Sequence, residues 1–356
     1  MLETIALTTV SFIGILILLV FAHEFGHFIT AKLARVKVEE FGIGFPPRIV
    51  SFKRGETTYS LNAIPLGGFT KMLGEEDPTL PGSLASKSIP IRLLVLSAGS
   101  LMNILLPIFL LSISFMIPHD MLLEKVQVQE VASGSPAQIA GIQPGDTILA
   151  INDRTIKNRG DVGYIIQLNL GSEVNMLLQR GELGQQEVTM EPRWKPPEGQ
   201  GATGISIIGV DSTVVRESYP IWKAVPSSVT HCWEVLVLFR NEVVGWFIRG
   251  KAPQLTGPIG IATLTGEMAK AGISPLLEFA ALISINLAII NLFPFPGLDG
   301  GRLIFVALEW VRRGKRISPK REGLVHLIGF IVLILLIMVI SYYDIANIIH
   351  GGSALP

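Results

Sequence analysis

The chain has 356 residues, of which 49% are hydrophobic and only 16% charged, and its mean hydropathy is +0.50. Soluble proteins carry about 25% charged residues, so this composition argues against a soluble enzyme and favours a membrane protein of two or three domains. Lys and Arg together number 29, as do Asp and Glu, so the basic excess of a nucleic-acid-binding protein is absent. The single cysteine, Cys232, excludes an internal disulfide and a cysteine zinc site.

Four apolar runs have the length of transmembrane helices. They lie at residues 5–22, 93–117, 279–298 and 324–343. A helix rises about 1.5 Å per residue, so about 20 residues cross the roughly 30 Å hydrocarbon core. The first run is unlike a signal peptide, because no positive charge precedes it and no small-residue cleavage site follows it. We therefore predict four transmembrane helices, the first retained and extending to about residue 28.

Basic residues are concentrated in two of the loops between these runs. Lys and Arg are frequent in residues 29–92 and again in 302–321, whereas residues 1–4 and the chain after Tyr343 contain neither. Cytoplasmic loops carry such an excess, which places both basic loops in the cytosol and both termini outside. The segment 118–278 is then outside as well.

Part of this outer segment has the pattern of a small β domain. Short alternating runs occur at residues 126–131, 147–151, 174–178 and 187–190. Between the first two lie Gly134-Ser135-Pro136-Ala137 and a Pro144-Gly145-Asp146 turn. The order and spacing resemble a bacterial PDZ domain over residues 126–191, and we predict such a domain at residues 121–213, the alternative being an unrelated β domain. The resemblance implies a sheet edge that binds extended peptide termini, or a domain that only filters access by size.

The outer segment continues with an amphipathic stretch within residues 214–275. From Trp222 to Gly250 the sequence is apolar but interrupted by five charges, among them Glu234 and Arg240. It is too charged to span the membrane, so we predict an interfacial helix anchored by its tryptophans. The alternative is an ordinary helix packed on the outer domain.

Residues suited to catalysis follow the first apolar run. His23-Glu24-Phe25-Gly26-His27 is an H-E-x-x-H motif. Residues i and i+4 of a helix share one face, so both imidazoles can bind one Zn²⁺, with Glu24 beside the metal as a base for its water. A pair of surface histidines is the weaker alternative, because ionisable groups at membrane depth are costly and functional by default.

A third metal ligand is predicted at Asp299, which ends the third apolar run. A catalytic zinc takes three protein ligands and keeps one position open. The loop charges place the ends of the first and third spans at similar depth, near the cytosolic side. Pro294 and Pro296 break the helix there and free backbone groups that protein must satisfy. Alone, Asp299 fits a helix-end turn; paired with the H-E-x-x-H motif, it favours a ligand.

The two motifs together resemble the site-2 protease family of intramembrane zinc metalloproteases. They are H-E-F-G-H and N-L-F-P-F-P-G-L-D-G-G, and the likeness covers almost the whole chain, including Gly257–Ile261. It is greatest to the bacterial RseP-like regulators of sigma-factor activation, in a form with a single PDZ domain. The resemblance implies that His23, His27 and Asp299 bind Zn²⁺ and that Glu24 is the catalytic base.

The resemblance also implies substrate contacts. Asn291 would contact the substrate backbone, the alternative being a cap for carbonyls freed near the prolines. Residues 57–73 are rich in β-formers and are predicted to turn at Pro65–Gly68. In the family this region, here about 40–75, is a membrane-dipping β-hairpin that holds the substrate as an added strand, which implies contacts at Gly67 and Gly68. The alternative is a surface hairpin.

Cleavage of a peptide bond requires an extended substrate segment. In a transmembrane helix the carbonyls are engaged in the helix's own hydrogen bonds. One departure concerns the second span, where the family commonly has proline at the position of Ser100. This departure bears on whether the second span bends at Ser100. It does not affect the prediction of the catalytic residues.

We therefore predict a membrane α-helical protein with a membrane-associated β-hairpin and an inserted, mainly β, PDZ domain. Its parts are an N-terminal membrane part, a PDZ domain, an interfacial segment and a C-terminal membrane part, at residues 1–120, 121–213, 214–275 and 276–356. The predicted activity is intramembrane zinc metalloproteolysis of single-span proteins in a bacterial inner membrane. By resemblance, the substrates are anti-sigma factors or remnant signal peptides.

Two other classes of function stay open. One is a non-proteolytic scaffold that holds partners through its PDZ domain. The other is a metal transporter, which is disfavoured because the second and fourth apolar runs contain no carboxylate.

Overall fold

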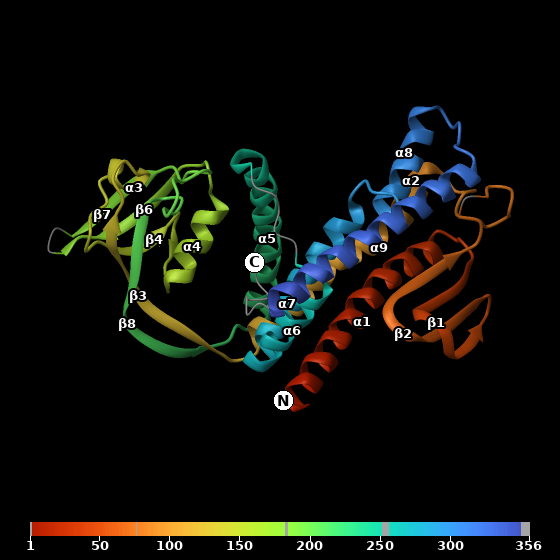
Figure 1. Ribbon diagram of the computed structural model, residues 1–356, viewed down its shortest axis with the longest axis horizontal. Coiled ribbons are helices and arrows are strands. Elements are labelled where there is room, and N and C mark those ends of the chain that lie inside the picture. Colours follow the sequence, from red (N-terminus) through yellow and green to blue (C-terminus); the bar gives the residue numbers. More distant parts are fainter. Residues whose placement is uncertain (1, 76, 182–183, 251–255, 350–356) are drawn as a thin grey trace. The chain divides into compact units, whose positions relative to one another are not determined.

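The computed structural model describes residues 2–75, 77–181, 184–250 and 256–349, which are drawn in colour in Figure 1. The predicted C-terminal membrane part includes residues 350–356, which lie outside the described residues. The chain forms two compact units. The helical unit comprises Met1–Ser114, Ala224–Cys232 and Gln254–Pro356, and the β unit comprises Phe115–Lys223 and Trp233–Pro253.

Four helices of the helical unit are long and apolar enough to cross a membrane, as predicted. They are α1 (Leu2–Leu33), α2 (Ile89–Met116), α7 (Ile273–Leu292) and α9 (Pro319–Ile349). Within the most apolar stretch of each helix, 44% is buried in α2 and 33% in α7. The buried share is only 11% in α1 and 6% in α9. The apolar surface of α1 and α9 is therefore available to lipid, while α2 and α7 pack inside the unit.

The helices of the third and first spans end at other residues than predicted. α7 stops at Leu292, short of the predicted residue 298, because Pro294 and Pro296 lack the N–H groups that would continue it. Asp299 consequently does not end the third span but begins a further helix, α8 (Asp299–Val311). α1 instead continues to Leu33, so the H-E-x-x-H motif lies within the helix rather than at its end.

Two further helices lie in the predicted interfacial segment. α5 (Ile221–Arg249) coincides with the expected amphipathic stretch, and its residues are divided between the two units. α6 (Pro258–Ala271), in the later part of the segment, packs against α1, α7 and α9. Its first turn is fixed by the buried carboxylate of Asp344 on α9, which accepts hydrogen bonds from the N–H groups of Gly257 and Gly260.

A small sheet of two long, bent strands packs against α1. The strands are β1 (Val38–Arg54) and β2 (Thr57–Met72). Residues 48–54 pair with 57–62, whereas residues 40–43 pair with 58–61 and also with 68–71. β2 thus changes its partner residues across Pro65–Gly67, where the turn is predicted, although it is one continuous strand. Residues 68–72 pair with β1 on one side only, and no other strand of the described residues pairs with them.

The β unit is built on a six-stranded sheet of order β7-β6-β4-β3-β8, with β5 paired to β4. A core of aliphatic side chains, including Val126, Ile148 and Leu178, lies between the sheet and its helices. The strands are β3 (His119–Val131), β4 (Thr147–Ile151), β5 (Arg154–Thr155), β6 (Val174–Gln179), β7 (Gln185–Met190) and β8 (Ile205–Glu217), and the helices are α3 (Pro136–Ile139) and α4 (Arg159–Leu168).

β3 and β8 run past the domain limits predicted at residues 121 and 213, so each limit falls within a strand. β3 and β8 pair as one antiparallel ribbon from His119 opposite Glu217 to Val131 opposite Ile205. The ribbon's outer end would lose its partner at either predicted limit. β8 itself was not among the expected strands.

Candidate metal centre

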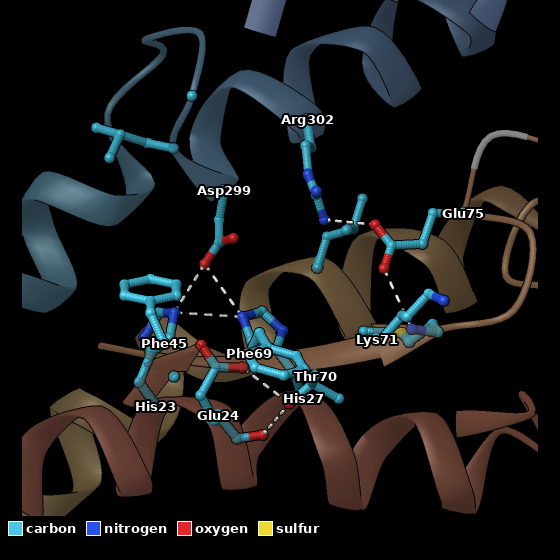
Figure 2. Close-up of a pocket in the computed structure, with 15 residues that line it drawn as sticks. His23, Glu24, His27, Phe45, Phe69, Thr70, Lys71, Glu75, Asp299 and Arg302 are labelled. Atoms are coloured by element: carbon cyan, nitrogen blue, oxygen red, sulfur yellow. Dashed lines mark hydrogen bonds and ion pairs between the residues drawn. The ribbon is translucent and has the colours of Figure 1, made fainter. Parts of the chain in front are cut away.

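Two histidines and one aspartate converge within the helical unit. His23 and His27 lie one turn apart on α1, and Asp299 is the first residue of α8. The two Nε2 atoms are 3.3 Å apart, and each lies 3.1 Å from Oδ2 of Asp299 (Figure 2). The three atoms all lie within 4.8 Å of one another, close enough to bind one ion.

The chemistry of these donors fits Zn²⁺. Two imidazole nitrogens and one carboxylate oxygen are a common protein donor set for a catalytic zinc with an open position. Nδ1 of His27 donates to the carbonyl of Val95 at 2.8 Å, which leaves the Nε2 lone pair for a metal. The buried Oδ1 of Asn103 has no hydrogen-bond partner among the described residues, while its Nδ2 lies 3.4 Å from Nδ1 of His23. Turning this amide over lets Oδ1 accept from Nδ1 of His23, which prepares the second imidazole in the same way.

The imidazoles fit because two helices approach closely at glycines. A Cβ at Gly26 of α1 would meet the carbonyl of Ala98 on α2. A Cβ at Gly99 would meet both imidazoles, Cε1 of His23 at 2.7 Å and Nε2 of His27. Small residues allow such close backbone contact between membrane helices. The glycine in the apolar second run is a signal of close packing, but its partner cannot be identified from sequence.

Asp299 is presented by a tight turn in front of α8. A Cβ at Gly300 would collide with the carbonyls of Leu292 and Phe293, so only glycine permits the chain to fold back here. The N–H of Gly297 donates to Nδ1 of His326 on α9 at 3.0 Å, which holds the proline-containing loop. The Asp-Gly-Gly sequence therefore supplies both the carboxylate and the turn that directs it toward α1.

Glu24 faces the strand segment formed by residues 68–72. Its Oε2 accepts a hydrogen bond from Oγ1 of Thr70 at 2.8 Å, and this hydroxyl also lies 3.0 Å from the Glu24 carbonyl. Gly68 lets the strand pass close to the helix, because a Cβ there would lie 2.9 Å from Cγ of Glu24 and 2.8 Å from Cγ1 of Val20. The contact between Thr70 and Glu24 could not be predicted from sequence, because it depends on the tertiary packing of β2 against α1.

A cavity of about 500 Å³ connects the three converging residues, Glu24 and the strand segment. Of the predicted substrate contacts, Gly68 lines this cavity, whereas Asn291 and Gly67 are not among its lining residues. Opposite the strand, Arg302 of α8 forms an ion pair of 2.8 Å with Glu75 (Figure 2). The lining residues are His23, Glu24, His27, Phe45, Gly68, Phe69, Thr70, Lys71, Met72, Glu75, Leu96, Gly297, Leu298, Asp299 and Arg302.

The chain resembles known proteins over nearly its full length. A family model described as Peptidase family M50 matches residues 11–336. A protein of Clostridium acetobutylicum, classed by name with the zinc metalloproteases, is 35% identical over 93% of this chain and 94% of its own. The zinc metalloprotease RasP of Geobacillus kaustophilus is 30% identical over 97% of this chain and 99% of its own. RasP of Oceanobacillus iheyensis is also 30% identical, over 96% of this chain and 99% of its own.

Proposed function

This chain belongs to peptidase family M50 and is a zinc metalloprotease, and from that premise we propose that it cleaves peptide bonds in or near transmembrane helices of single-span substrates. The observation that carries the proposal is the convergence of His23, His27 and Asp299 within a unit of membrane-spanning helices. A catalytic centre among such helices acts on chains that share the bilayer.

The three converging residues hold the Zn²⁺. When bound, the ion polarises the scissile carbonyl and makes water a stronger acid. Glu24 lies on the cavity wall and is oriented by Thr70, so its carboxylate takes the proton of the attacking water and passes it to the leaving amine. General acid–base catalysis by a positioned side chain accelerates a reaction about 100- to 10,000-fold.

The substrate adds to the sheet as an extended strand. On the side away from β1, residues 68–72 pair with no other strand of the described residues, and they lie next to Glu24. A sheet edge binds an extended peptide through main-chain hydrogen bonds, which compensate for the helical bonds that unwinding breaks. Gly68, which lines the cavity, contacts the bound chain, as does its neighbour Gly67, and Asn291 contacts the substrate backbone near the bond that is cut.

The β unit is a PDZ domain that docks or filters substrates outside the membrane. The order of its strands and the turn at Pro144–Asp146 support this assignment. The substrates are anti-sigma factors already shortened on the outer side, or remnant signal peptides, in a bacterial inner membrane. The catalytic centre then faces the cytosolic side, with both termini and the PDZ domain outside.

Cleavage of a model single-span protein by the detergent-purified enzyme tests the proposal. We expect Glu24→Gln to lower the cleavage rate about 100- to 10,000-fold while zinc content stays equal, because the amide cannot accept the proton. Glu56→Gln is the matched control, since Glu56 is outside the cavity and pairs with Lys32 at 2.9 Å.

Equal cleavage by wild type and Glu24→Gln would overturn the role of Glu24 as the base, and no cleavage by wild type would favour the scaffold. Zinc flux into liposomes that depends on the same residues would favour the transporter.

A further inference from the structure

The strand segment 68–72 has a row of backbone donors directed away from β1. The N–H of Leu73 donates to the carbonyl of Lys37 at 2.8 Å, so this group points toward β1. Successive N–H groups along a strand point to opposite sides. The N–H of Met72 therefore points to the unpaired side, as do those of Thr70 and Gly68. These are the donors that an added strand uses.

One of these donors is already occupied by a side chain. Oε1 of Glu75 accepts the hydrogen bond of the Met72 N–H at 3.2 Å. Its other oxygen, Oε2, forms the ion pair of 2.8 Å with Nη1 of Arg302. Both Glu75 and Arg302 line the cavity of the converging histidines, and Arg302 follows Asp299 by one helical turn on α8. The carboxylate of Glu75 thus stands where a carbonyl of an added strand would accept.

We propose that Glu75 is a specificity-determining residue that mimics a substrate carbonyl at Met72 and must be displaced by the extended substrate. This inference rests on the strand addition under the proposed function. The restraint is weak enough to be displaced, because it consists of one hydrogen bond and an ion pair whose arginine is 45% exposed. A short extended segment that stops before Met72 does not compete with Glu75.

Displacement also selects for charge. When Glu75 leaves, its ion pair with Arg302 is broken. A substrate with an acidic side chain near the residue that pairs with Met72 replaces the lost ion pair. The enzyme accordingly prefers substrates with Asp or Glu at that position over otherwise identical substrates with Ala.

Steady-state cleavage of a single-span substrate by the full-length enzyme tests the proposal. We expect Glu75→Ala to lower KM about three- to ten-fold with kcat unchanged, since one hydrogen bond no longer has to be exchanged. Glu75→Gln has a smaller effect, because its amide oxygen can still accept from Met72 but cannot pair with Arg302. Glu56→Ala, which also loses an ion pair with a basic residue, leaves KM unchanged. A raised KM in Glu75→Ala at equal zinc content would overturn the proposal.

Two further measurements separate this inference from the proposed function. Amide hydrogen exchange at Met72 is faster in Glu75→Ala than in wild type whether or not the enzyme cleaves the substrate, and an unchanged rate would contradict the mimicry. In a series of substrates carrying one Asp at successive positions, wild type has its lowest KM at one position, and Arg302→Gln loses this preference. A KM in wild type that does not vary with the position of the Asp would contradict the charge selection. Failure of wild type to cleave any substrate would count against the proposed function alone.

Discussion

The space for the two imidazoles depends on a residue that has no side chain. A Cβ at Gly99 would meet both His23 and His27, and neither can withdraw, because His27 is held by Val95 and the α1 backbone passes close to α2 at Gly26. We expect Gly99→Ala to displace the imidazoles and to raise the Kd for zinc at least about ten-fold, which is about 1.4 kcal/mol of binding free energy, so that zinc is lost during purification. Metal analysis of the purified protein measures this loss.

The control for this substitution is Gly14→Ala, also in a membrane-spanning helix. A Cβ at Gly14 meets no atom within 4 Å, so the variant should retain full zinc content. Circular dichroism establishes whether both variants keep their helices. Full zinc occupancy in Gly99→Ala would show that α1 and α2 separate more readily than their contacts indicate.

A buried ion pair makes the stability of the β unit depend on pH. The side chain of Asp146 is 1% exposed, and both its oxygens bind Arg180, at 2.8 Å and 2.6 Å. Burial opposes ionisation, but Arg180 and the N–H of Gln143 outweigh it and hold the pKa of Asp146 below its ordinary value. A lowered pKa gives stability that is complete above the unfolded value of about 3.9 and is lost as pH falls through the folded value.

We therefore expect amide protection in β4 to be constant above about pH 5 and to fall below about pH 4. Arg180→Ala leaves the carboxylate buried without its cation and should lower the free energy of unfolding by about 3 kcal/mol at pH 7. Hydrogen exchange of the full-length protein measures both effects. A protection profile in wild type that stays flat down to pH 3 would show that Asp146 does not control stability.

At the scale of elements, the four membrane helices and the H-E-x-x-H motif could be predicted because their determinants are local. An apolar run longer than the bilayer and a spacing of i and i+4 need no knowledge of distant residues. Asp299 could be predicted as a ligand because the loop charges place it at the same depth as the H-E-x-x-H motif, and the family resemblance adds to that prediction. Its position at the start of α8 was not predicted, since the prolines end α7 earlier than the apolar run ends.

The parts that sequence did not indicate all depend on pairing between distant segments. Thr70 reaches Glu24 only because β2 lies against α1, and Gly99 backs the histidines only because α2 crosses α1. β8 was missed because its exposure does not alternate cleanly, so the period-two pattern of a half-buried strand is weak. Pairing with β3 stabilises it instead.

At the scale of the whole molecule, the proposed membrane orientation rests on the charges of the loops and can be tested with single cysteines. The native Cys232 is buried, and burial raises the pKa of its thiol to about 11, so it reacts slowly with maleimides. A cysteine can be placed in the β unit at Ile139, which is 83% exposed, and another at Lys315 in the exposed loop between α8 and α9.

In intact spheroplasts we expect a membrane-impermeant maleimide to label Ile139→Cys and to leave Lys315→Cys unlabelled, because the basic loops stay in the cytosol. Detergent should make Lys315→Cys equally reactive, and the unmodified protein should remain unlabelled in both conditions, which controls for Cys232. Labelling of Lys315→Cys in intact spheroplasts would reverse the orientation. The catalytic centre would then face the outer side, and substrates would have to be cleaved from the opposite leaflet.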